Sequence, residues 1–124
     1  MWFTGPVLSD TDVVPEWLTV PDVMERTGAT LQAVRRWLQE RDVVGVRRGP
    51  DRVVMIPATF FVDDGPLPTL RGTITVLGDG GHSDEEIVAW LHAPDDTLPG
   101  GSAIASLHAG AKTEVRRRAQ EEAF

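Results

Sequence analysis

A short helix that ends in glycine and is followed at once by a second helix constrains the fold of this chain most strongly. In the first segment, residues 17–28, Thr19 is suited to cap the helix, Pro21 falls in its first turn and Gly28 supplies the exit. Glycine is favoured at a helix exit because it has no Cβ to clash in the left-handed region. Two short helices joined by such a turn predict a helix-turn-helix.

The second helix is expected from Leu31 to about Arg41, with Thr30 as its N-cap. Its apolar residues recur at spacings of three and four, which predicts a buried stripe formed by Leu31, Val34, Trp37 and Leu38. The opposite face carries only polar residues, namely Gln32, Arg35, Arg36 and Gln39.

A β-hairpin is expected directly after the second helix. The β-branched runs 43–48 and 52–56 flank Gly49-Pro50-Asp51, a composition typical of a turn. A hairpin in this position is a wing. Its tip is flanked by Arg47, Arg48 and Arg52, where a wing meets phosphates.

The residue types on these elements suit double-stranded DNA. Glutamine offers a donor and an acceptor to a base edge, arginine offers a fork to guanine, and the wing arginines suit phosphates. The alternative is that the arginines and glutamines of the second helix are only its solvated face. The combination of helix-turn-helix, wing and local charge favours DNA. The expected DNA-binding residues are Thr30, Gln32, Arg35, Arg36, Gln39, Arg47, Arg48 and Arg52.

The net charge of −7, taken for the whole chain, argues against a nucleic acid partner. The charge is unevenly spread, however. Residues 1–16 carry −3, residues 17–62 carry seven arginines against five acidic residues, and residues 63–124 carry −6. The helix-turn-helix and wing therefore form a locally basic module between acidic flanks, so the net charge predicts salt-sensitive binding without excluding DNA.

The second half of the chain is expected to be a helical domain. The turn composition of residues 63–68 marks its start, which divides the chain into a flexible arm (1–12), a winged helix-turn-helix (13–62) and a helical C-terminal domain (63–124). Helices are expected at 68–77, after a capping box at Ser83–Glu86, after Ser102, and around Val115 and Ala119. Residues 73–76 are β-branched and also suit a strand. The expected fold class is mainly α with a small β-hairpin wing.

No catalytic or metal site is expected. The chain has no cysteine, and its three histidines lack the spacing of metal ligands. Residues 78–81 are glycine-rich, but no Lys-Ser/Thr follows, so they indicate a helix end rather than a phosphate loop. We therefore expect neither an enzyme nor a cofactor.

The longest apolar run is too short to span a bilayer and no secretory signal is visible, which favours a cytoplasmic location. Neither a coiled-coil repeat nor a strongly apolar exposed helix indicates a dimer.

A family resemblance agrees with this interpretation. Within residues 17–62, Trp-Leu-Thr-Val-Pro-Asp-Val, Val-Arg-Arg-Trp-Leu-Gln-Glu-Arg and Val-Arg-Arg-Gly resemble the winged helix-turn-helix of the MerR/excisionase type. Over residues 13–124, with Glu-Ile-Val-Ala-Trp-Leu-His-Ala-Pro-Asp and Leu-His-Ala-Gly, the chain resembles small actinobacterial DNA-binding proteins that are substrates of protein kinase L, a membrane-anchored Ser/Thr kinase. The resemblance implies a transcriptional regulator and phosphoprotein. The resemblance also implies that the N-terminal arm is phosphorylated, and the candidate sites in this arm are Thr4, Ser9 and Thr11.

A second resemblance leaves an alternative open. Trp-Leu, Pro-Asp, Leu-Pro-Gly-Gly and Leu-His-Ala-Gly in the second half are also similar to the toxin-binding domain of Xre/ParS-type antitoxins. On this alternative, residues 63–124 bind a protein partner and the first half acts as a scaffold or in autoregulation.

Overall fold

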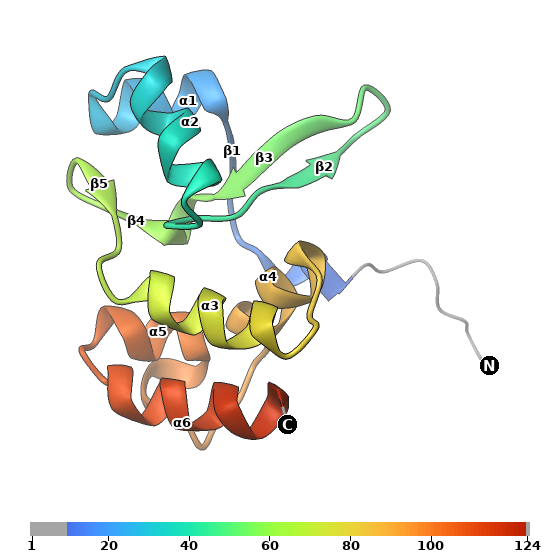
Figure 1. Ribbon diagram of the computed structural model, residues 1–124, viewed down its shortest axis with the longest axis vertical. Coiled ribbons are helices and arrows are strands. Elements are labelled where there is room, and N and C mark those ends of the chain that lie inside the picture. Colours follow the sequence, from blue (N-terminus) through green and yellow to red (C-terminus); the bar gives the residue numbers. More distant parts are fainter. Residues whose placement is uncertain (1–9, 124) are drawn as a thin grey trace.

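The computed structural model describes residues 10–123, so that two of the candidate phosphorylation sites, Thr4 and Ser9, lie outside the described residues. Within that range no helix is long and apolar enough to cross a membrane. The first half forms a winged helix-turn-helix and the second half a helical domain (Figure 1). In chain order the elements are η2 (Asp10–Val13), β1 (Trp17–Thr19), α1 (Val20–Thr27), α2 (Leu31–Gln39), β2 (Val46–Arg48), β3 (Val53–Pro57), η3 (Ala58–Phe60), β4 (Phe61–Val62), β5 (Gly65–Pro66), α3 (Leu70–Asp79), α4 (Asp84–His92), η4 (Pro99–Gly101), α5 (Ala103–His108) and α6 (Lys112–Ala123).

The capping residues define both helices of the helix-turn-helix. Thr19 Oγ1 accepts a hydrogen bond from the backbone N–H of Asp22, whose carboxylate accepts one from the N–H of Thr19. Gly28 ends α1 at a φ of +77°. Thr30 Oγ1 accepts from the N–H of Ala33 and so caps α2. The predicted caps and glycine exit are therefore confirmed.

The strand that precedes the first helix was not predicted, because residues 17–19 were assigned to the helical segment. Trp17–Thr19 is a strand, and α1 begins only at Val20. Strand β1 pairs with β3, with Leu18 opposite Ile56, and the sheet order is β1-β3-β2. The wing is therefore anchored in a three-stranded antiparallel sheet. Strand β3, with which β1 pairs, lies almost forty residues further along the chain, so no local sequence pattern reveals this pairing.

One residue of the predicted α2 stripe is not buried. Val34 is fully buried and Trp37 and Leu38 are half-buried, whereas Leu31 is 38% exposed. At about 100° per residue, Leu31 lies at the edge of the stripe, about 40° around the helix from the exposed Arg35. The spacing rule gives the face of a helix but not the point at which its packing partner ends.

The boundary between the halves is a tight hairpin. Strands β4 and β5 pair across Asp63 and Asp64, and the N–H of Leu67 donates to the carbonyl of Phe60. Helix α3 then begins at Leu70, so the strand alternative for residues 73–76 is wrong. The Ser83 capping box of α4 and the Ser102 cap of α5 are confirmed.

The glycine-rich residues 78–81 end α3 where it crosses α6. A Cβ on Gly80 would lie 2.8 Å from the Ala123 Cα, so this close approach needs a glycine. Residues 78–81 therefore have a packing role, in agreement with the predicted helix end.

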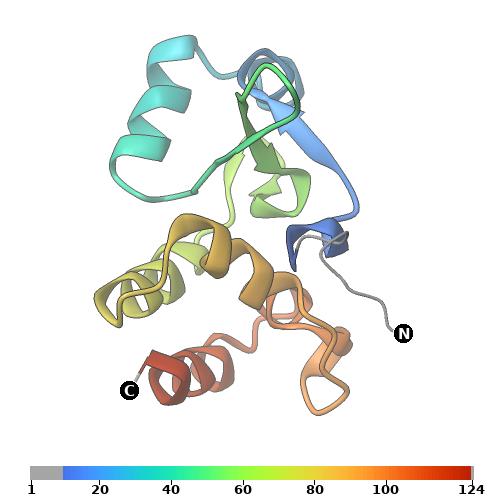
Figure 2. The same ribbon diagram turned by 90° about the vertical axis from the view of Figure 1, so that its right-hand side faces the viewer.

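The two halves share one hydrophobic core, and Figure 2 shows the helical layers directly below the helix-turn-helix. Two histidines of the second half, His92 and His108, form hydrogen bonds with Thr59 of the first half. Thr59 Oγ1 lies 2.7 Å from His92 Nε2, and the carbonyl of Thr59 accepts from His108 Nε2 at 2.6 Å. Arg41 adds an ion pair to Asp84 at 2.9 Å. These contacts fix the orientation of the winged helix-turn-helix on the C-terminal domain.

Candidate nucleic-acid interface

The exposed face of α2 carries four polar side chains that point away from the core: Gln32, Arg35, Arg36 and Gln39 are all exposed. Among the described residues, no carboxylate lies within 4.0 Å of the guanidinium groups of Arg35 and Arg36. Thr30 is exposed at the start of the helix, but its hydroxyl oxygen is engaged in the cap. The face therefore offers two unneutralised cations between two amides.

Two of the three wing arginines are free to reach a ligand. Arg47 and Arg52 are exposed and flank the tip, and the described residues place no carboxylate within 4.0 Å of either. Arg47 Nη1 donates to the carbonyl of Arg52 at 3.0 Å, which ties the two sides of the tip together. The turn itself uses Gly49 at a φ of +78° and places Arg52 in the left-handed region at +54°.

The third wing arginine, Arg48, has a different environment. It is half-buried, its Cζ lies 4.4 Å from the centroid of the Trp17 ring, and its Nη1 donates to Thr11 Oγ1 at 2.8 Å. Thr11 is fully buried. Arg48 thus braces the wing against β1 and the turn η2. Sequence reasoning missed this role because it depends on a contact across 37 residues.

Most of the remaining arginines are neutralised by acids. Arg26 pairs with Glu16 at 2.9 Å, and this contact raises the pKa of the Arg26 guanidinium. On α6, Arg117 pairs with Glu114 at 2.6 Å and with Glu121 at 3.1 Å. Such pairs leave little net field at the surface, so the four arginines of α2 and the wing that have no ion pair within the described part of the chain dominate the charge of these two elements.

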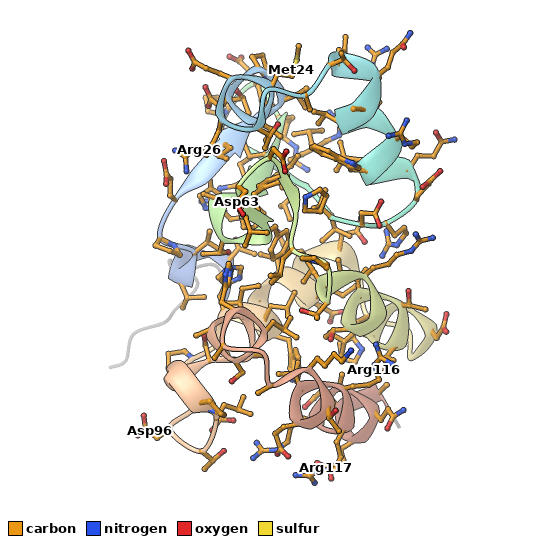
Figure 3. The ribbon with its side chains drawn as sticks, turned by 90° about the vertical axis from the view of Figure 1, so that its left-hand side faces the viewer. Met24, Arg26, Asp63, Asp96, Arg116 and Arg117 are labelled. Atoms are coloured by element: carbon orange, nitrogen blue, oxygen red, sulfur yellow. The ribbon has the colours of Figure 1, made fainter. Side chains whose placement is uncertain are left out.

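The arginines of α6 lie at the far end of the molecule. Arg117 lies at the pole opposite Met24 of α1 (Figure 3), whereas the guanidinium group of Arg116 lies against Gly72 of α3. Lys112 and Arg116 have no ion pair within the described residues, but they belong to α6, which lies on the far side of α3 from α2 (Figure 1). They are therefore not part of the α2 and wing surface.

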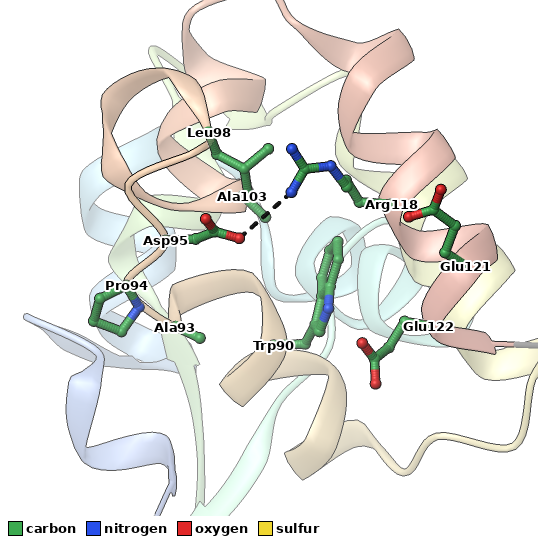
Figure 4. Close-up of a pocket in the computed structure, with 9 residues that line it drawn as sticks. All are labelled: Trp90, Ala93, Pro94, Asp95, Leu98, Ala103, Arg118, Glu121 and Glu122. Carbon is green, nitrogen blue, oxygen red and sulfur yellow. Dashed lines mark ion pairs between the residues drawn. The ribbon is translucent and has the colours of Figure 1, made fainter.

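The C-terminal domain contains a cavity of about 310 Å³ between α4 and α6, with Trp90, Arg118, Glu121 and Glu122 among its lining residues (Figure 4). Arg118 is the only cation of its lining. It donates to Glu114 at 2.8 Å and lies 3.5 Å from Asp95. The cavity is therefore acidic overall and unsuited to a polyanion.

The histidines serve the structure. His92 Nδ1 donates to the carbonyl of Val88 at 2.8 Å, which leaves Nε2 to accept from Thr59. Burial lowers the pKa of His92 below its ordinary value of 6.5. No group of three potential metal ligands occurs among residues 10–123.

The comparisons with known proteins cover both halves. Residues 7–61 match the family described as "DNA-binding protein Rv2175c, wHTH domain", and residues 67–123 match "Rv2175c C-terminal domain of unknown function". The chain is 36% identical over 117 residues to the DNA-binding protein Rv2175c of Mycobacterium tuberculosis, covering 85% of this chain and 79% of that protein. It also resembles the NMR structure of Rv2175c, with a TM-score of 0.76 at 30% identity and complete coverage of both chains. This chain therefore belongs to the Rv2175c family.

Proposed function

We propose that this protein binds double-stranded DNA through α2 and the wing and regulates transcription. The observation that carries the proposal is a set of four exposed arginines on these two elements, Arg35, Arg36, Arg47 and Arg52, for which residues 10–123 provide no ion-pair partner, in a chain of net charge −7. A cation that is left unpaired among so many carboxylates is available to an external anion. The name of the M. tuberculosis relative, a DNA-binding protein, supports the same function.

In this proposal, α2 lies in the major groove. Gln32, Arg35, Arg36 and Gln39 face the base edges, where glutamine suits adenine and arginine suits guanine. Thr30, at the N-terminus of α2, lies next to the phosphate backbone, because helix N-termini contact phosphates.

The wing holds the adjacent backbone. Arg47 and Arg52 contact phosphates, while Arg48, held by Trp17 and Thr11, sets the direction of the wing and acts mainly as a positioning residue. The acidic flanks repel the remaining phosphates, so these few arginines supply most of the affinity, and binding falls steeply with salt.

Fluorescence anisotropy with a labelled duplex tests this function. The wild-type protein is expected to bind at about 50 mM salt, where electrostatic binding is strong. The double variant Arg35→Ala/Arg36→Ala should bind much more weakly, whereas Arg117→Ala, which removes a neutralised arginine, should bind like the wild type. Absence of wild-type binding, or equal losses in both variants, would contradict the proposal.

Phosphorylation of the N-terminal segment is the regulation we propose. A phosphoryl group adds almost two negative charges, which suits it to compete with DNA for arginines. The contact between Thr11 and Arg48 places the start of the described chain beside the wing, which supports this competition. A kinase needs an accessible hydroxyl, so the full burial of Thr11 favours Thr4 and Ser9 as the modified residues.

This regulation is tested by comparing DNA affinity before and after treatment with a Ser/Thr kinase, with the modified residue identified by mass spectrometry. We expect weaker DNA binding after modification at Thr4 or Ser9, and no change in a variant with alanine at both positions. Equal affinity of the modified and unmodified protein would exclude the switch.

A further inference from the structure

Leu31 is an exposed apolar residue that lies outside the hydrophobic core. Only three large apolar side chains are exposed among residues 10–123, and one of them is Leu31, at 38%. The side chain is not part of the continuous hydrophobic core, although its spacing from Val34 and Leu38 predicts that it should be. A substantial part of this side chain is therefore available for contact with a ligand.

The position of Leu31 points to a ligand instead. It is the first residue of α2, directly after the Thr30 cap, and one helical turn before Arg35. Its neighbours around the exposed side of the helix are Gln32 and Arg35. In helix-turn-helix proteins the N-terminal residues of the second helix reach the base edges.

We infer that Leu31 reads the 5-methyl group of a thymine in the major groove. The thymine methyl is the only apolar group that a base edge presents there, and apolar side chains recognise it by contact. A leucine exposed among amides and guanidinium groups supplies this contact, while its polar neighbours supply hydrogen bonds. The inference rests on the proposed DNA binding and adds a base preference to it.

The expected effect is small and specific. Removing one buried methyl group from the interface corresponds to about 0.8 kcal/mol, or about fourfold in affinity. Uracil is the ideal probe, because it keeps every hydrogen-bonding group of thymine and lacks only the methyl. Each thymine of a duplex selected by the purified protein from random sequence is replaced in turn by uracil, and affinities are measured by anisotropy.

Four proteins are compared on these duplexes. The wild type should lose about fourfold at one or two thymines. Leu31→Ala should bind the thymine and uracil duplexes equally at those positions, and Leu31→Met should retain the difference. Thr30 carries the other exposed methyl at this end of α2, so Thr30→Ser, which keeps the capping hydroxyl, should discriminate like the wild type.

The possible failures are distinguishable. If the wild type binds no duplex, the proposed function fails, and this inference with it. If the wild type binds but no thymine is sensitive, or if Leu31→Ala discriminates as well as the wild type, only the inference is wrong. Loss of discrimination in Thr30→Ser rather than in Leu31→Ala would assign the contact to Thr30. Thermal unfolding of each variant checks that folding is intact, as expected for two exposed positions.

Discussion

The wing makes a quantitative prediction about salt. Arg47 and Arg52 flank the tip, are exposed and have no carboxylate partner among the described residues, so each is expected to neutralise one phosphate. Every phosphate contact contributes about 0.9 to the slope of log affinity against log salt. The double variant Arg47→Gln/Arg52→Gln should therefore reduce the slope by about 1.8.

The size of this effect is easy to measure. Between 50 and 200 mM salt, a fourfold change, one contact corresponds to a loss of about 3.5-fold in affinity and two contacts to about 12-fold. The wild type should thus lose about 12-fold more affinity over this range than the double variant. Glutamine preserves most of the side-chain length and one donor group, so the comparison isolates the charge.

The matched control is Arg117→Gln. This arginine is also exposed to solvent, on α6, but it is paired with Glu114 and Glu121, and it lies at the opposite pole of the molecule (Figure 3). Its removal should leave the slope unchanged. Equal slopes for the wild type and the wing variant, with DNA binding intact, would refute the assignment of phosphate contacts to the wing.

Three further predictions concern stability. Arg48→Lys keeps the positive charge but loses the planar contact with the Trp17 ring, so it should lower the free energy of unfolding, measured by urea titration, by about 1 kcal/mol. Arg47→Lys, the control, should change this free energy little. Ser83→Ala should cost about 1 kcal/mol in urea unfolding, because the N–H of Glu86 loses the hydroxyl oxygen that caps the helix, and unchanged stability would argue against the cap. The pKa of Glu86, which is lowered mainly by the backbone N–H of residue 83 and secondarily by the Ser83 hydroxyl, should rise only in part in an NMR titration of this variant, because the backbone N–H remains. Burial lowers the pKa of His92, so below its ordinary value of 6.5 the unfolded chain binds the proton more readily than the folded chain. The free energy of unfolding should therefore fall as the pH falls, by at most about 1.4 kcal/mol per pH unit. His92→Gln should remove this part of the pH dependence, and a dependence that persists in the variant would assign it to other groups.

The features predictable from the sequence are those that depend on neighbours within a few residues. The caps Thr19, Thr30 and Ser83, and the left-handed Gly28, each act on backbone groups two to four residues away. Helix positions therefore followed directly from residue types, and so did the solvent-facing side of α2.

The features that could not be predicted depend on distant contacts. Strand β1 exists only because β3 pairs with it, and the bracing role of Arg48 requires Thr11 to fold back beside the wing. The exposure of Leu31 depends on where the surface that packs against α2 ends. That residues 63–124 bind a protein partner, as an antitoxin does, stays a prediction.

The most direct test of the account is an NMR titration of the labelled protein with duplex DNA. The largest shifts in backbone amide resonances are expected in Thr30, in α2 (31–39) and in residues 47–52 of the wing, with the amides of α6 almost unaffected. Because the two halves share a core, a uniform small response elsewhere is compatible with binding at one end. Shifts concentrated on α6, with α2 and the wing unchanged, would contradict the proposed DNA-binding surface.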